Sequence, residues 1–211
     1  MAYARGNRQC GRFRPLGAFR RDEWCRHPRL RPGLTSGGLA KRIELRRHTA
    51  NDGDVLTDEG ITAAIAIGRR LDARYTLVAS SGAQRSTQTA ACILAAVSSE
   101  VPLGVIVEPA LRSDVEDRWR AAYQKAGAGD LAFLESADPE LVADDSARLA
   151  VGLENLFNRL PENGRALAIG HSPTNEAAVL GLTGEMVAPL GKGEGVLITM
   201  VGDGYTVEPA L

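Results

Sequence analysis

Short apolar runs recur along the chain and predict β-strands. Most of them are bounded by Gly, Pro, Asp or Ser, which is typical of strands buried in a sheet. The predicted strands span residues 43–46, 76–80, 101–107, 166–170, 196–201 and 205–207. The last two flank Gly202, Asp203 and Gly204, a turn sequence that predicts a hairpin.

Between these runs, apolar residues recur at the spacing of an α-helix. Thr57 is a typical N-cap, and the acidic Asp58 and Glu59 follow it, where the helix dipole favours negative charge. The apolar stripe of this helix consists of Ile61, Ala64, Ile65, Gly68 and Leu71, and the predicted range is 58–72. Three more helices are predicted: an Ala-rich one over residues 81–97, one with the stripe Leu149, Leu153, Leu156, Phe157 and Leu160 that ends before Pro161 and Gly164, and one from about residue 173.

Strands separated by helices are typical of a sheet whose strands are mostly parallel, because a parallel connection needs a crossover segment. The sequence therefore predicts the α/β class, as a three-layer α/β/α sandwich around a mostly parallel central sheet.

Composition limits the classes to which the protein can belong. The 211 residues are 44% hydrophobic and 24% charged, a profile typical of a soluble globular domain. The longest apolar runs, such as residues 196–201, are far shorter than the roughly 20 residues that span a bilayer. The three cysteines, Cys10, Cys25 and Cys92, are an odd number without zinc-finger spacing, so we expect a reducing, cytoplasmic location.

The net charge of −1 conceals an asymmetry between two segments. Residues 1–42 hold 11 Lys and Arg against Asp22 and Glu23, a charge of +9, whereas the rest holds 14 basic and 24 acidic residues, a charge of −10. The first segment has many Gly and Pro residues and no apolar periodicity. We therefore expect residues 1–40 to be a disordered extension, translated from an upstream start codon, and residues 41–211 to form the globular domain. The alternatives are a transit peptide or a basic arm that contacts nucleic acid. The acidic domain would repel a polyanion, so we do not expect a nucleic-acid partner.

Residues suited to phosphate chemistry follow three of the predicted strands. Arg47 and His48 end the first strand, Arg85 follows the second, and His171 follows the strand at 166–170. In parallel sheets, ligands bind beyond the carboxyl ends of the strands. Two imidazoles and two guanidiniums at this edge require an anion between them, and helix N-termini favour bound phosphate.

The order and spacing of these residues resemble the histidine phosphatase superfamily, which includes the cofactor-dependent phosphoglycerate mutases. The resemblance covers about residues 42–211 and implies the phosphoglycerate mutase-like fold. The segments that carry it are Arg47-His48, Leu56-Thr57-Asp58-Glu59-Gly60, residues 80–90 and Gly170-His171.

The resemblance implies a role for each residue. His48 would attack phosphorus and form a phosphohistidine, with one ring N–H held by a backbone carbonyl. Arg47 and Arg85 would clamp the phosphoryl oxygens, and His171 would donate to them. No metal or cofactor would be needed. For Arg46, strand alternation predicts a surface ion pair pointing away from Arg47.

The chain departs from the family pattern at two places. Thr49 stands where the family usually has Gly, so its hydroxyl is a candidate contact to the substrate phosphate. Ser113 follows Leu111 and Arg112, where many members have a glutamate that acts as general acid. Asp114 or Glu108 could take that role, although Ser113 and Glu116 also form a capping-box pattern.

The function predicted from these observations is a metal-independent phosphatase with a phosphohistidine intermediate at His48. Without a strong general acid, its best substrates would have good leaving groups, including phosphohistidine and acyl phosphates. The partner would be a phosphorylated small molecule or a phosphoprotein, and not a membrane. The alternatives are a phosphoglycerate mutase-like transferase and a non-catalytic protein that binds phosphorylated ligands on the same scaffold.

The basic extension gives the first testable prediction. We expect a chain that starts near Leu39 to keep the melting temperature and activity of the full chain, because the removed segment has little apolar area to offset the entropy of ordering it. Thermal unfolding and phosphatase assays of both chains check this. A fall of several degrees would show that the extension packs on the domain, and lost activity alone would show that its arginines reach the substrate.

Overall fold

The computed structural model describes residues 40–71 and 74–210. The predicted basic extension over residues 1–40 lies outside this part of the chain, apart from Ala40, and stays a prediction. None of the helices in the described ranges is long and apolar enough to cross a membrane.

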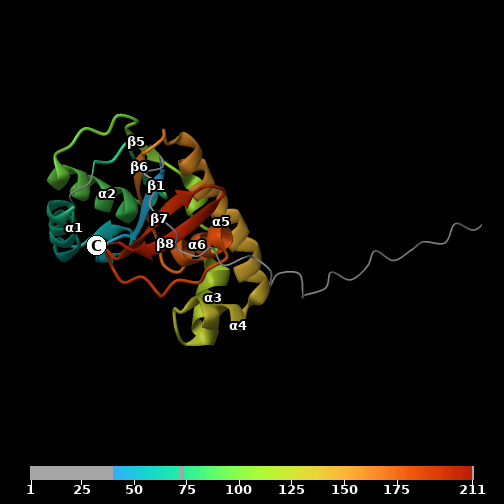
Figure 1. Ribbon diagram of the computed structural model, residues 1–211. Coiled ribbons are helices and arrows are strands. Elements are labelled where there is room, and N and C mark those ends of the chain that lie inside the picture. The colour runs from blue at the N-terminus through green and yellow to red at the C-terminus, as the bar shows by residue number, and fades with distance from the viewer. Residues whose placement is uncertain (1–39, 72–73, 211) are drawn as a thin grey trace, which may run out of the picture. The chain divides into compact units, whose positions relative to one another are not determined.

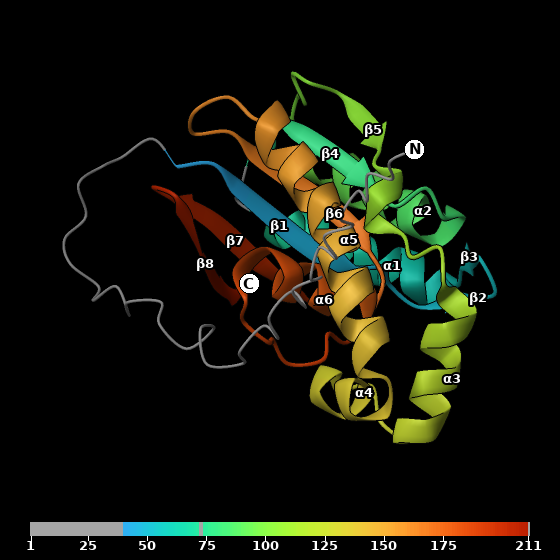
Figure 2. The same ribbon diagram turned by 90° about the vertical axis from the view of Figure 1, so that its right-hand side faces the viewer.

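A six-stranded sheet forms the centre of the domain, in the order β5-β4-β6-β1-β7-β8 (Figures 1 and 2). Its first four strands are mutually parallel, whereas β7 runs antiparallel to β1 and β8 antiparallel to β7. The strands are β1 (Arg42–Arg47), β4 (Leu77–Ser80), β5 (Val105–Val107), β6 (Arg165–Gly170), β7 (Gly195–Val201) and β8 (Gly204–Pro209). The predicted mostly parallel sheet and its C-terminal hairpin are confirmed.

Helices cover both faces of this sheet, as a three-layer sandwich requires (Figures 1 and 2). The helices α1 (Asp58–Arg70) and α2 (Gln84–Val97) pack on one face, over an apolar cluster that includes Val78, Leu167 and Ile169. On the opposite face, α5 (Pro139–Arg159) and α6 (Thr174–Thr183) pack over a larger cluster. The sequence signals at the helix ends are confirmed: the Thr57 hydroxyl accepts a hydrogen bond from the Gly60 amide at 3.1 Å, and α5 ends before Pro161.

Some boundaries differ from the prediction for identifiable reasons. The helix expected from residue 81 begins only at Gln84, because Gly82 has a φ of +87° and turns the chain before the helix can start. The strand expected from residue 101 is limited to Val105–Val107, since the segment before it forms a turn.

Several short elements were not predicted. They are the hairpin β2 (Asn51–Asp52) and β3 (Val55–Leu56), the 3₁₀ turn η2 (Pro109–Leu111), α3 (Glu116–Ala126) and α4 (Leu131–Ala137). Only Trp119 and Ala122 are buried on α3, so this helix has too little apolar periodicity to be recognised in the sequence. It is held by a hydrogen bond from the Trp119 indole to Asp145 of α5, at 2.6 Å, and by a bidentate contact of Arg118 with Asp138, at 2.7 Å.

The ion pair expected of Arg46 is present, but its expected location at the surface is wrong, because the side chain is buried. Arg46 Nε donates to Glu44 at 2.6 Å, and both residues lie in the interior of the domain. The Glu44 carboxylate also accepts hydrogen bonds from the Tyr75 hydroxyl, at 2.7 Å, and from Arg165. Burial and the neighbouring Glu44 charge raise the pKa of Tyr75. A buried carboxylate needs several such partners to offset its loss of hydration.

Candidate active site

The backbone of His48 is fixed at the carboxyl end of β1. Its N–H donates to the Gly170 carbonyl at 3.1 Å, and its carbonyl accepts from the Gly193 amide at 3.3 Å. Just before it, the Arg47 N–H donates to the Glu194 carbonyl at 2.9 Å. The imidazole therefore projects from a strand end that is held by its neighbours on both sides.

The ring of His48 is held in one tautomer. Its Nδ1 lies 2.9 Å from the Thr49 carbonyl oxygen, which can only accept, so Nδ1 carries the proton. Its Nε2 lies 3.3 Å from Arg85 Nε, which can only donate, so Nε2 carries the lone pair. This is the arrangement that a nucleophilic imidazole needs.

Burial and nearby cations keep His48 neutral. Burial lowers its pKa from 6.5 to about 4. The hydrogen bond to the Thr49 carbonyl acts against this shift, whereas the charges of Lys192, Arg85 and Arg47 add to it. At neutral pH the lone pair on Nε2 is therefore free of a proton.

His171 lies beside His48, with ring centroids 5.2 Å apart and ring planes inclined at 62°. It follows β6, and its Nε2 lies 2.7 Å from the Ser81 hydroxyl and 3.4 Å from that of Ser86. Its Nδ1 is buried and has no hydrogen-bond partner in the described part of the chain. Burial, together with the charge of Arg85, lowers the pKa of His171 to about 3.

Arg85 is positioned by a residue that the sequence analysis missed. Asp54, in the turn of the β2–β3 hairpin, accepts from Arg85 Nη1 at 2.6 Å and from the Gln84 amide at 3.1 Å. It thus caps the start of α2, where Ala83 offers no capping side chain. Asp54 is exposed, and a small loss of hydration that would raise its pKa is outweighed by the Gln84 amide and by the charge and hydrogen bonds of Arg85, which lower it. The sequence around Gln84 does not indicate this cap, because Asp54 belongs to a separate hairpin.

Arg47 lies on the α6 side of the same strand end. Its Nη1 donates to the Leu190 carbonyl at 2.7 Å, and its Nε is buried with no acceptor among the residues that the structure describes. Its charge contributes to the low pKa of His48. The structure thus brings Arg47, His48, Arg85 and His171 to one edge of the sheet, in line with their predicted convergence.

Lys192 adds a further cation that sequence reasoning did not find. It lies in the loop before β7, and its Nζ donates to the Asn51 side chain. Gly193 has a φ of +80°, and a Cβ there would lie 2.8 Å from Ile67, so glycine is needed for the loop to approach β1. Burial and the charges of Arg47 and Arg85 lower the pKa of Lys192 to about 8.

Thr49, the expected contact to the substrate phosphate, lies in the interior of the domain. The side chain is fully buried, and its hydroxyl lies 3.3 Å from that of Thr89 on α2. The Thr49 amide donates to the same Thr89 oxygen at 3.2 Å. Thr49 therefore attaches α2 to the end of β1.

Both candidates for the general acid are engaged elsewhere. The buried Glu108 accepts from the Ala110 amide at 3.3 Å and from Asn155 at 3.4 Å, so it holds the η2 turn. Asp114 is exposed and pairs with Arg148 at 3.3 Å. The capping box is also absent, because Ser113 accepts from the Val115 amide and α3 begins only after Val115.

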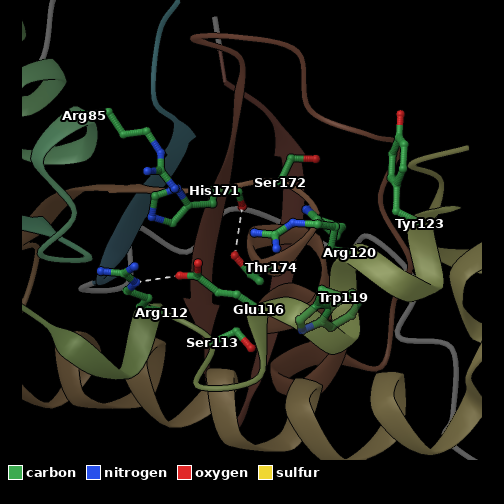
Figure 3. Close-up of a pocket in the computed structure, with 11 residues that line it drawn as sticks. Arg85, Arg112, Ser113, Glu116, Trp119, Arg120, Tyr123, His171, Ser172 and Thr174 are labelled. Carbon is green, nitrogen blue, oxygen red and sulfur yellow. Dashed lines mark hydrogen bonds and ion pairs between the residues drawn. The ribbon is translucent and has the colours of Figure 1, made fainter. Parts of the chain in front are cut away.

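A cavity of about 240 Å³ opens next to His171 and is walled by α3 (Figure 3). Arg85 and His171 border it on the side of the two histidines, and Trp119, Arg120 and Tyr123 border it on the side of α3. Two other charged residues of α3 do not border the cavity: Arg118 donates a hydrogen bond to Asp138, and Lys125 donates one to the Ala137 carbonyl.

Across residues 40–71 and 74–210, no three His, Cys, Asp or Glu side chains lie close enough together to hold a metal ion.

Comparison with solved structures identifies the fold. A mycobacterial glucosyl-3-phosphoglycerate phosphatase superimposes with a TM-score of 0.60 at 17% identity, over 81% of this chain and 98% of its own. A phosphoglycerate mutase of Bacillus anthracis gives a TM-score of 0.59 at 17% identity, over 82% and 93% of the two chains. The chain has the phosphoglycerate mutase-like fold.

A third structure with this fold is a phosphoserine phosphatase mutant of Entamoeba histolytica in complex with phosphoserine. It has a TM-score of 0.50 and 18% identity, over 79% of this chain and 94% of its own. No family model and no curated protein matches the sequence. The superpositions on solved structures confirm the fold that was expected from the resemblance.

The position of Lys192 predicts a pH dependence. Because its pKa is about 8, Lys192 is a cation below pH 8 and loses its charge as the pH rises through 8. We expect kcat/KM for an anionic phosphate ester to fall over this range, since this parameter reports groups of the free enzyme. K192M should lower kcat/KM about two- to fivefold at pH 7 and remove the fall near pH 8.

Two variants control this experiment. K192R keeps the charge and should move the fall to higher pH, whereas K125M, at an α3 residue outside the cavity, should leave the profile unchanged. Persistence of the fall near pH 8 in K192M would assign the titration to another group.

Proposed function

We propose that the protein is a metal-independent phosphatase that hydrolyses phosphate esters or phosphohistidine through a phosphohistidine at His48. The observation that carries this proposal is the state of His48: a neutral ring whose Nε2 lone pair faces Arg85 among cationic side chains. A phosphoryl group is the anion that fits both features, because its phosphorus accepts the lone pair and its oxygens accept from the cations.

In the first step, His48 Nε2 forms a bond to phosphorus while the bond from phosphorus to the leaving group breaks. The leaving group takes the electron pair of that bond. Arg47, Arg85 and Lys192 supply positive charge for the phosphoryl oxygens, and Arg85 must first release Nε2. The Nδ1–H bond to the Thr49 carbonyl stabilises the ring as Nε2 becomes substituted.

In the second step, water attacks phosphorus, the bond to Nε2 breaks, and its electron pair returns to His48 as the lone pair. The proton that the water loses passes to the phosphate product or to solvent. His171 lies beside His48, and its Nδ1 has no hydrogen-bond partner among the described residues. This nitrogen is therefore the atom of His171 that we expect to contact the phosphoryl group. Ser81 fixes that ring from the opposite nitrogen.

The preferred leaving groups follow from the acids near the site. Glu108 and Asp114 hold other contacts, and the carboxylate that borders the cavity, Glu116, is paired with Arg112 at 2.6 Å. A leaving group that departs without full protonation is therefore favoured, as in phosphohistidine, acyl phosphates and activated esters. Two proteins with the same fold are phosphatases, one of glucosyl-3-phosphoglycerate and one of phosphoserine, so the fold is compatible with hydrolysis of phosphate monoesters.

The first experiment is hydrolysis of p-nitrophenyl phosphate with and without a chelator. The proposal expects turnover in both cases. Loss of turnover in the presence of the chelator would show that the enzyme requires a metal ion. Tight binding of phosphate compounds without turnover would indicate a binding protein, and transfer to a second hydroxyl in place of water would indicate a mutase.

Replacement of the nucleophile should abolish turnover. We expect His48→Ala and His48→Asn to lose hydrolysis of p-nitrophenyl phosphate, because neither supplies a ring nitrogen that can attack phosphorus. The Asn variant retains an N–H donor for the Thr49 carbonyl, so it also tests the role of the ring if the Ala variant does not fold. Circular dichroism monitors folding. Wild-type turnover in either folded variant would remove the phosphohistidine mechanism.

Arg85→Lys tests whether the planar guanidinium is required. A lysine keeps the charge but cannot bond both to the phosphoryl group and to Asp54, so we expect transition-state stabilisation to fall by about 2–4 kcal/mol. The matched control is Arg118→Lys, which lies outside the cavity and should leave kcat/KM unchanged. Near-normal kcat/KM for Arg85→Lys would place the phosphate site elsewhere.

A further inference from the structure

The wall that α3 contributes to the cavity has an excess of positive charge. Apart from Arg85 of α2, the charged residues that line the cavity are Arg112, which precedes α3, and Arg120 and Glu116 of α3. Arg112 and Glu116 form an ion pair at 2.6 Å, so these two charges compensate each other. Arg120 is left as the cation that no other lining residue neutralises.

Arg120 is available to a ligand. Its ion pair is with Asp117, at 2.7 Å, and both side chains are mostly exposed, at 68% and 94%. Exposed pairs of this kind are worth little, so a ligand can replace Asp117 at small cost. Figure 3 shows Arg120 reaching from α3 towards the middle of the cavity, on the side of Thr174.

The remainder of this wall offers apolar surface at a fixed place. Trp119 is buried and anchored to Asp145 through its indole N–H, at 2.6 Å, while Tyr123 lines the cavity with half of its surface exposed. A volume of about 240 Å³ lies below the roughly 300–1,000 Å³ of pockets for drug-sized ligands, which indicates a small leaving group.

We infer that this cavity receives the leaving group of a small phosphorylated metabolite, and that the leaving group carries a carboxylate or a second phosphate that binds Arg120. The inference rests on the proposed function, since Arg85 and His171 border the same cavity and would hold the transferred phosphoryl group at its inner end. It makes Arg120 a specificity-determining residue, with Trp119 and Tyr123 contacting the carbon skeleton.

A pair of isosteric substrates tests this inference. In 4-carboxyphenyl phosphate and 4-carbamoylphenyl phosphate, the phosphate and ring are the same, and only the first has an anionic leaving group. We expect the wild-type protein to favour the carboxylate by about tenfold in kcat/KM. R120Q should reduce this ratio to near one, R120K should retain part of it, and R69Q, at an exposed residue of α1 outside the cavity, should leave it unchanged.

Other outcomes separate the two proposals. Equal hydrolysis of both esters by the wild-type protein, or an unchanged ratio in R120Q, would overturn the anionic subsite and leave the phosphatase intact. If the protein hydrolyses neither of these esters and does not hydrolyse p-nitrophenyl phosphate, the proposed function is overturned, and the subsite with it. A third substrate, 4-phosphonooxyphenyl phosphate, distinguishes the two anions. If the wild-type protein hydrolyses it faster than 4-carboxyphenyl phosphate, and R120Q removes this difference in rate, the subsite is assigned to a second phosphate.

Discussion

Strand β1 is hydrogen-bonded along both edges, to β6 on one side and to β7 on the other. This double pairing holds the strand end that carries Arg47 and His48, and it brings neighbouring strand ends to the same place. His171 comes directly after β6, and the loop of Lys192 comes directly before β7. The carbonyls of Gly170 and Glu194 and the amide of Gly193 then fix the backbone at the last two positions of this segment. Because Arg47, His48, His171 and Lys192 all start from this junction, their mutual geometry depends on β1 remaining central.

The second constraint is electrostatic. Two imidazoles lie 5.2 Å apart among arginines and a lysine, and burial with like charges drives the pKa of His48 to about 4 and that of His171 to about 3. The protein thus avoids a cluster of buried cations by leaving both rings neutral. A neutral ring is also the form that attacks phosphorus, so the same charges that would bind a phosphoryl group maintain the nucleophile.

The sequence indicated the strands, the two outer layers and the histidines at strand ends, because those features depend on local periodicity and on the rule that parallel strands end at one edge. It did not indicate Asp54 or Lys192, since each reaches the site from a separate loop through a tertiary contact. Arg46 was expected at the surface, yet the fold places it beside the buried Glu44. Thr49 was expected to contact the phosphate, and the packing of α2 against β1 places its hydroxyl in the interior, beside that of Thr89. Residues that depend on neighbours distant in sequence are those that pattern alone could not place.

The central claim is that His48, and not His171, carries the phosphoryl group. Phosphohistidine survives in alkali, so rapid quenching of a reacting sample into alkali, followed by proteolysis and mass spectrometry, would locate the intermediate. We expect one phosphoryl group on the peptide that contains His48, formed at least as fast as turnover. A phosphoryl group on His171, or turnover with no phosphorylated histidine at any quench time, would contradict it.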